Sequence, residues 1–114
     1  RWDTAVGGHI ARGESVPDAL RRESREEIGI GPAGAVPLFR YVNRTEIESE
    51  LVHAFALRHE GPFTPQASEI TELRFCTRDD LEALLAAGAC TLNFVQELAK
   101  LEGLGWPGRF PAGV

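Results

Sequence analysis

Three glutamates, Glu23, Glu26 and Glu27, lie in a stretch with the pattern of an amphipathic helix. At about 100° per residue they fall together along one edge of its apolar stripe. Carboxylates at this spacing repel one another by roughly a few tenths of a kcal/mol per pair. One interpretation is a solvated acidic face that Arg22, Arg25 and counterions neutralise. The other is a divalent cation site, because magnesium and manganese prefer several oxygen ligands.

Local signals define the helix that would position these carboxylates. Ser15 followed three residues later by Asp18 is a capping-box pattern, which favours a helix start. Pro17 lies in the first turn, where its missing N–H costs little. Gly29 stands where a helix end favours a left-handed residue. We therefore expect a helix over about residues 16–28.

The residues before and along this helix complete a longer pattern. It consists of a glycine, five residues, a glutamate, seven residues, Arg-Glu, an apolar residue, any residue, Glu-Glu, any residue, a glycine and an apolar residue. Its specified positions are filled by Gly8, Glu14, Arg22, Glu23, Glu26, Glu27, Gly29 and Ile30. Only Ser24 departs, since an aliphatic residue is usual there. A match with such constrained spacing is specific, and the chain resembles the Nudix hydrolases.

The resemblance implies a metal-dependent hydrolase of diphosphates. In that family the pattern, called the Nudix box, forms a loop, a helix and a second loop that hold magnesium or manganese. The metal binds the diphosphate of a nucleoside diphosphate linked to another group. By position, Glu23 and Glu27 would be the principal ligands, Glu26 the third, and the carbonyl of Gly8 a further one.

The resemblance also implies supporting and catalytic roles. Glu14 and Arg22 would brace the loop against the helix through charge-assisted hydrogen bonds. Their alternative is a surface ion pair of little energetic value. A metal-coordinated water would attack phosphorus in line after a carboxylate takes its proton. Family members draw this base from the box or from a downstream loop, so the catalytic candidates are Glu26, Glu27 and Glu69.

The fold implied is α/β, an α/β/α sandwich with a mixed β-sheet. Sequence patterns after the box predict strands at 36–43, 50–58 and 69–76, and helices at about 78–87 and 92–101. We expect one domain over 1–114, with the box at 8–30 and a tail at 103–114. The strands that usually open this fold normally precede a segment like residues 1–6. We therefore expect a fragment of a longer protein, the alternative being that those strands were lost.

Other residues before and after the box add a second resemblance. Residues 7–9, 48–58 and 69–80 are similar to isopentenyl-diphosphate isomerase, a relative of the same fold. By position His9, Glu48 and Glu50 would match its metal and acid/base residues. Glu48 and Glu50 are separated only by Ser49, so on a strand they would share a face and could bind the same cation. The alternative is that both are exposed residues at the edge of the sheet.

Two features disfavour isomerase chemistry. That enzyme places its acid/base cysteine where this chain has Gly7, and a glycine cannot transfer a proton. It also lacks the full run of box glutamates. A non-catalytic diphosphate-binding module is the remaining alternative.

Composition limits the classes of partner. The chain has 114 residues, a net charge of −5 and a pI near 5.2, which argue against charge-driven binding to nucleic acid or membranes. It has neither a long apolar run nor a signal-peptide pattern, so we expect a cytoplasmic protein with a small diphosphate-containing substrate. The oligomeric state stays open, with a homodimer as one option. Cys76 and Cys90 are expected to be reduced packing residues.

Overall fold

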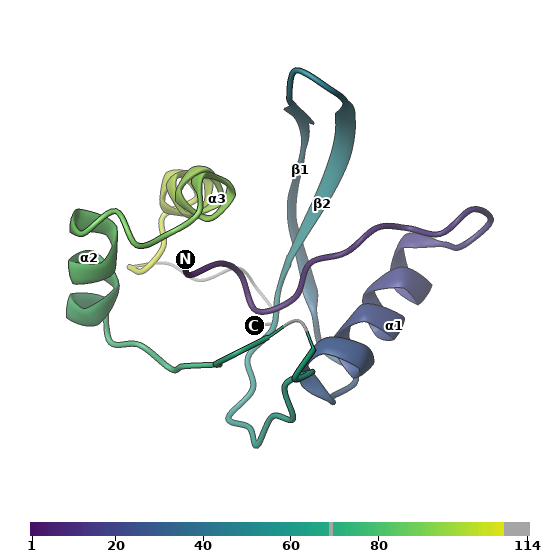
Figure 1. Ribbon diagram of the computed structural model, residues 1–114, viewed down its shortest axis with the longest axis horizontal. Coiled ribbons are helices and arrows are strands. Elements are labelled where there is room, and N and C mark those ends of the chain that lie inside the picture. Colours follow the sequence, from purple (N-terminus) through teal and green to yellow (C-terminus); the bar gives the residue numbers. More distant parts are fainter. Residues whose placement is uncertain (69, 109–114) are drawn as a thin grey trace.

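The computed structural model describes residues 1–68 and 70–108. Within these ranges the elements are α1 (Val16–Ile28), β1 (Val36–Arg44), β2 (Ser49–Ala56), α2 (Arg78–Ala86) and α3 (Leu92–Gly103). β1 and β2 form an antiparallel hairpin, which stands between α1 on one side and α2 and α3 on the other (Figure 1). The α/β class, with helices on two sides of the β-structure, is confirmed.

Helix α1 begins and ends where the sequence predicts. Its N-cap Ser15 Oγ accepts a hydrogen bond from Asp18 N at 3.2 Å, which satisfies one of the unpaired amides of the first turn. Gly29 closes the helix with φ 74°, a left-handed conformation that glycine adopts without steric cost. These local interactions fix the orientation of the carboxylate-bearing edge.

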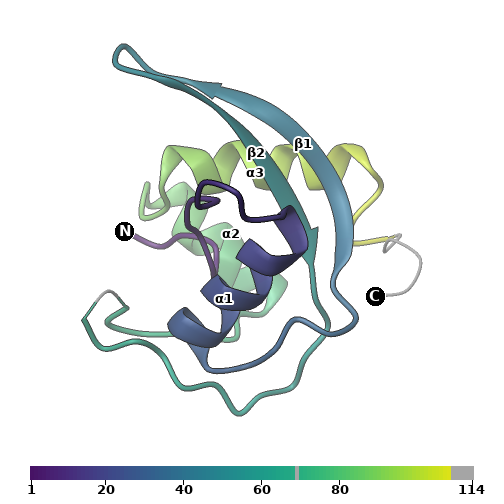
Figure 2. The same cartoon turned by 90° about the vertical axis from the view of Figure 1, so that its right-hand side faces the viewer.

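The connection between β2 and α2 docks onto the C-terminal end of α1. Thr64 N donates to Ile28 O, and Gln66 N donates to Glu27 O, each at 2.9 Å. Figure 2 shows this connection passing the end of the helix. Because the last carbonyls of a helix lack partners within it, these two bonds attach the loop to the box helix.

The buried core is formed mainly by small and aliphatic residues. Its apolar members are Ala19, Ile28, Ala54, Cys90 and Leu98. Ser24, where an aliphatic residue is usual, is only 3% exposed, so a small polar side chain occupies a core position of α1. Cys90 packs as expected, but the expectation for Cys76 is wrong because this side chain is exposed.

The hairpin differs slightly from its predicted bounds. The register pairs Val36 with Ala56 and Asn43 with Glu50, with an irregularity between Pro37 and Phe39. Proline lacks the N–H that a regular ladder uses, which accounts for a break at this point. Residues 45–48 form the turn, closed by a 2.8 Å bond from Thr45 N to Glu48 O.

The strand predicted at 69–76 is wrong for residues 70–76, which form no strand, while Glu69 lies outside the described residues. In the described part of the chain, β1 and β2 pair only with each other, so this segment has no strand to pair with. Parallel pairing is limited there to a bridge between Trp2 and Cys90, with Trp2 N donating to Ala89 O at 2.7 Å. The sheet is therefore smaller than the mixed sheet expected.

The two C-terminal helices agree with the sequence pattern. Thr77 and Asp80 form the reciprocal capping box of α2, and α3 runs two residues beyond its expected end at 101. Arg78 joins these helices, because its Nη2 donates to Glu102 Oε2 at 3.1 Å. No helix in residues 1–68 and 70–108 has the length and apolar character needed to cross a membrane.

Candidate catalytic site

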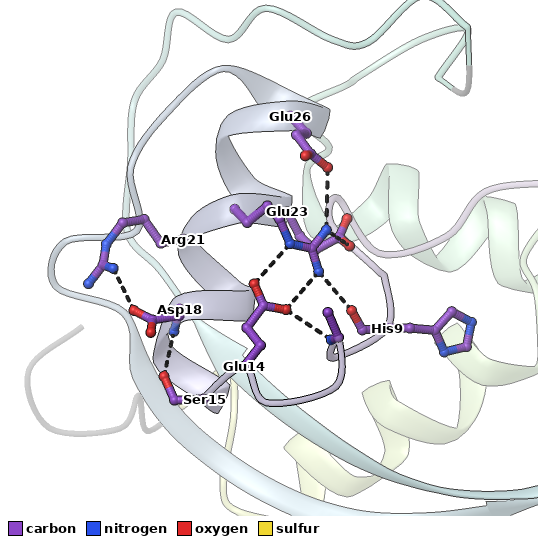
Figure 3. Close-up of polar contacts among 9 residues, drawn as sticks. His9, Glu14, Ser15, Asp18, Arg21, Glu23 and Glu26 are labelled. Carbon is purple, nitrogen blue, oxygen red and sulfur yellow. Dashed lines mark hydrogen bonds and ion pairs between the residues drawn. The ribbon is translucent and has the colours of Figure 1, made fainter.

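Arg22 is the centre of a network that joins the box loop to α1. Its Nε and Nη2 donate to the two oxygens of Glu14 at 2.9 and 3.0 Å, a bidentate pair. Nη1 donates to Glu23 Oε1 at 2.7 Å and more weakly to Glu26 Oε2 at 3.5 Å, and Nη2 also donates to the His9 carbonyl at 2.9 Å. Figure 3 shows these carboxylates arranged around the guanidinium group.

The pair of Glu14 and Arg22 is more than a loose surface contact. The Glu14 side chain is 17% exposed, and its Oε1 also accepts from Ala11 N at 2.9 Å. The hydrogen bond from Arg22, followed by that from Ala11, lowers the pKa of Glu14 from 4.5 to about 2. The carboxylates of Glu14 and Glu23 in turn raise the pKa of Arg22. Both groups therefore stay charged at neutral pH.

Glu23 and Glu27 lie against the two glycines that enter the box. Glu27 is only 8% exposed, and its Oε2 accepts a hydrogen bond from Gly7 N at 3.0 Å. The Glu23 carboxylate occupies the space that a Cβ at Gly8 would need. A side chain at position 8 would therefore displace Glu23, so this close approach requires glycine.

The carboxylate oxygens of the box suit a hard cation, but they form hydrogen bonds with different protein groups. Arg22 donates hydrogen bonds to Glu23 and Glu26, whereas the Gly7 amide donates to Glu27. Among residues 1–68 and 70–108, no three His, Cys, Asp or Glu side chains converge as a ready metal-binding group. Carboxylates on one helix edge, close to the Gly7–Gly8 backbone, nonetheless match the ligand chemistry of magnesium and manganese.

The downstream candidates are distributed differently. His9 Nδ1 lies 3.6 Å from Glu50 Oε2, and the His9 ring points away from the Arg22 network (Figure 3). Glu48 is exposed in the hairpin turn rather than on β2, so the interpretation in which it shares a strand face with Glu50 is wrong and the exposed alternative holds for Glu48. The register explains this, because Ser49 pairs with Arg44 at the end of the ladder. The role of Glu69 stays a prediction.

A cleft of about 1350 Å³ extends from the box across the hairpin to α3. Its lining includes Gly8 and Glu23 from the box, Glu50 from β2 and residues of the loop after β2, namely His59, Phe63 and Gln66.

Tyr41 on β1 and Glu97 on α3 also line the cleft, and sequence reasoning missed both. Their positions are far apart in the chain, and neither belongs to a local motif. A polar Glu97 next to the apolar face of α3 is the one signal that the sequence offers.

Comparison with known proteins identifies the family of the chain. The NUDIX domain family matches residues 1–98 of the chain. The chain belongs to the Nudix family. No solved structure matches it.

Curated relatives of this Nudix chain carry two kinds of name. The isopentenyl-diphosphate Delta-isomerase of Brevibacterium linens is 29% identical over 111 residues, covering 90% of this chain and 61% of the relative. The enzyme of that name from Leifsonia xyli is 33% identical over 98 residues, 79% of this chain and 51% of the relative. An uncharacterized Nudix hydrolase of Pseudomonas aeruginosa is 34% identical over 74 residues, 65% of this chain and 44% of its own length. The chain thus spans between about two-fifths and three-fifths of the length of these relatives.

Proposed function

We propose that this Nudix chain carries the catalytic box of a magnesium- or manganese-dependent hydrolase. Its substrate is a nucleoside diphosphate linked to another group, and water attacks phosphorus to cleave the diphosphate bond. The observation that carries this proposal is the meeting of both principal carboxylates, Glu23 and Glu27, with the Gly7–Gly8 segment at the mouth of the box.

Glu23, Glu26 and Glu27 would hold the cation, with the Gly8 carbonyl as a further donor. A bound cation neutralises phosphate oxygens and lowers the pKa of a coordinated water. Arg22, paired with Glu14, fixes the loop against α1 and offsets the repulsion between neighbouring carboxylates. Glu27 combines low exposure with a fixed backbone partner, which keeps its carboxylate oriented toward Gly7. Glu26, Glu27 and Glu69 are the candidates for the base that accepts the proton of water.

Isomerisation of isopentenyl diphosphate is the second candidate. The contact of His9 with Glu50 at 3.6 Å favours it, as do the names of several relatives. Gly7 weighs against it, because this position offers no side chain to transfer a proton. The open space around Gly7, where a Cβ would meet nothing within 4 Å, would accommodate a cysteine.

One assay separates these candidates. The purified protein is incubated with MgCl₂ or MnCl₂ and a panel of nucleotide sugars, dinucleotides, nucleoside triphosphates and isopentenyl diphosphate, and products are followed by phosphorus and proton NMR. We expect phosphate or nucleoside monophosphate from at least one nucleotide and no rearranged alkene. Release of neither product from the whole panel would reject hydrolysis, and a rearranged alkene would favour the isomerase.

A further inference from the structure

Tyr41 and Glu97 connect β1 to α3 within the cleft. The Tyr41 hydroxyl donates to Glu97 Oε2 at 3.0 Å, and the Glu97 side chain is half-buried. Lys100 Nζ lies 5.0 Å from the centre of the Tyr41 ring but does not line the cleft. This pair therefore gives one wall of the cleft a fixed carboxylate.

The protonation of this pair leaves Glu97 as an acceptor. Burial, followed by the hydrogen bond to Glu97 and the nearby Glu97 and Glu50 carboxylates, raises the pKa of Tyr41 to about 12, so the phenol keeps its proton and donates. Burial raises the pKa of Glu97, and the hydrogen bond that its Oε2 accepts from Tyr41 lowers it in part. Within the described part of the chain, no donor is recorded for Glu97 Oε1. A ligand in the cleft can therefore supply one.

The Glu97 carboxylate restricts which chemical groups of a ligand can lie against this wall of the cleft. It repels a phosphate group, since both are negatively charged. Hydrocarbon is also disfavoured, because it would remove water from the carboxylate without replacing the lost hydrogen bonds. A hydroxylated group is favoured, since each hydroxyl can donate to Oε1.

We propose that Glu97, oriented by Tyr41, is a specificity-determining residue that accepts a hydrogen bond from a hydroxyl on the group linked to the diphosphate. The inference rests on the proposed function and narrows its substrate to diphosphates that carry a sugar-like, hydroxylated group. Alkyl diphosphates are disfavoured, because their hydrocarbon would lie against the Glu97 carboxylate without donating a hydrogen bond to it.

Two matched ligands test this assignment by isothermal titration calorimetry in MgCl₂. ADP-ribose carries a hydroxylated ring on its diphosphate, and the cyclopentylmethyl ester of ADP carries a hydrocarbon ring of the same size. We expect the wild-type protein to bind ADP-ribose more tightly. Glu97→Leu, which keeps helix propensity but removes the acceptor, should weaken ADP-ribose binding by about tenfold or more and leave the cyclopentylmethyl ester unchanged or tighter.

Two further variants distinguish a specific role from a structural one. Glu97→Gln keeps an acceptor oxygen and should retain ADP-ribose binding better than Glu97→Leu. Gln96→Leu changes an exposed residue of α3 that does not line the cleft, and should leave both affinities unchanged. Equal losses for both ligands in Glu97→Leu, no loss for either, or wild-type protein that fails to prefer ADP-ribose would overturn the proposal.

Hydrolysis is scored separately in the same preparations. Turnover of both ADP esters without discrimination would overturn the specificity assignment and leave the hydrolase proposal intact. Discrimination in binding without turnover would support the role of Glu97 and count against hydrolysis.

Discussion

Gly7 and Glu27 are joined by a hydrogen bond of 3.0 Å from the backbone amide to the carboxylate. The bond links the residue just before the box to the last turn of α1, twenty positions along the chain. Glu27 is buried, and its own carbonyl accepts a hydrogen bond from Gln66 N. This one residue therefore contacts both the segment before the box and the loop after β2. Substitutions in either segment should therefore alter the position of the Glu27 carboxylate.

Replacing Gly8 with alanine should damage the site without unfolding it. The added Cβ would overlap the Glu23 carboxylate, which must then leave its position beside Arg22. We expect the hydrolysis rate to fall by roughly 10-fold to 100-fold, since small displacements of positioned groups have effects of this size. The rate is measured with MgCl₂ on the best substrate of the panel.

Gly103→Ala is the matched control for Gly8→Ala, because a Cβ at the end of α3 meets nothing within 4 Å. Its rate should equal that of the wild type. Equal rates for the two alanine variants would show that the approach of Glu23 to Gly8 has no functional role.

The pair of Glu14 and Arg22 should produce a pH-dependent part of the stability. The pKa of Glu14 is about 2 in the folded protein against an ordinary value of 4.5. A lowered folded-state pKa contributes stability that is complete above pH 4.5 and is lost as the pH falls toward 2. The Tm of the wild type should therefore exceed that of Glu14→Gln near neutral pH, with a gap that shrinks on acidification.

Thermal melts followed by circular dichroism across this acidic range measure the gap. Glu46→Gln removes an exposed carboxylate of the hairpin turn and should show little difference from wild type at any pH. A gap for Glu14→Gln that does not change between pH 4.5 and 2 would contradict the assigned pairing.

Loss of the N-cap should destabilise α1. Ser15→Ala removes the hydroxyl that accepts from Asp18 N, and we expect a decrease of about 1 kcal/mol in the free energy of unfolding. Urea denaturation followed by far-ultraviolet circular dichroism measures it. Ser68→Ala, in an exposed turn, should stay within roughly 0.5 kcal/mol of wild type. If the two variants are equally stable, the cap contributes nothing.

Local signals accounted for the box helix and its support. The caps at Ser15 and Gly29 act within a few residues of the helix ends, so the sequence contains all the information needed for its bounds. The pairing of Glu14 with Arg22 was implied by the resemblance to the Nudix hydrolases, and the first turns of α1 lie between the two residues.

Features that depend on distant partners could not be predicted in the same way. The bond between Tyr41 and Glu97 joins residues 56 positions apart, and no local pattern in either segment indicates the other. The alternating segment 70–76 has strand character but no neighbouring strand within the described residues, and pairing rather than propensity decides whether a strand forms. Glu48 lies off β2 because the hairpin register places it in the turn.

Glu27→Gln tests the assigned role of the box most directly. Glutamine keeps the shape of the side chain and an oxygen that can accept the Gly7 N–H, so the fold should be retained, while the charge needed to hold a cation is lost. We predict that the rate of diphosphate hydrolysis with MgCl₂ falls by at least about 100-fold, with Glu46→Gln at the wild-type rate. A folded Glu27→Gln protein whose rate stays within a few-fold of wild type would contradict the role of Glu27.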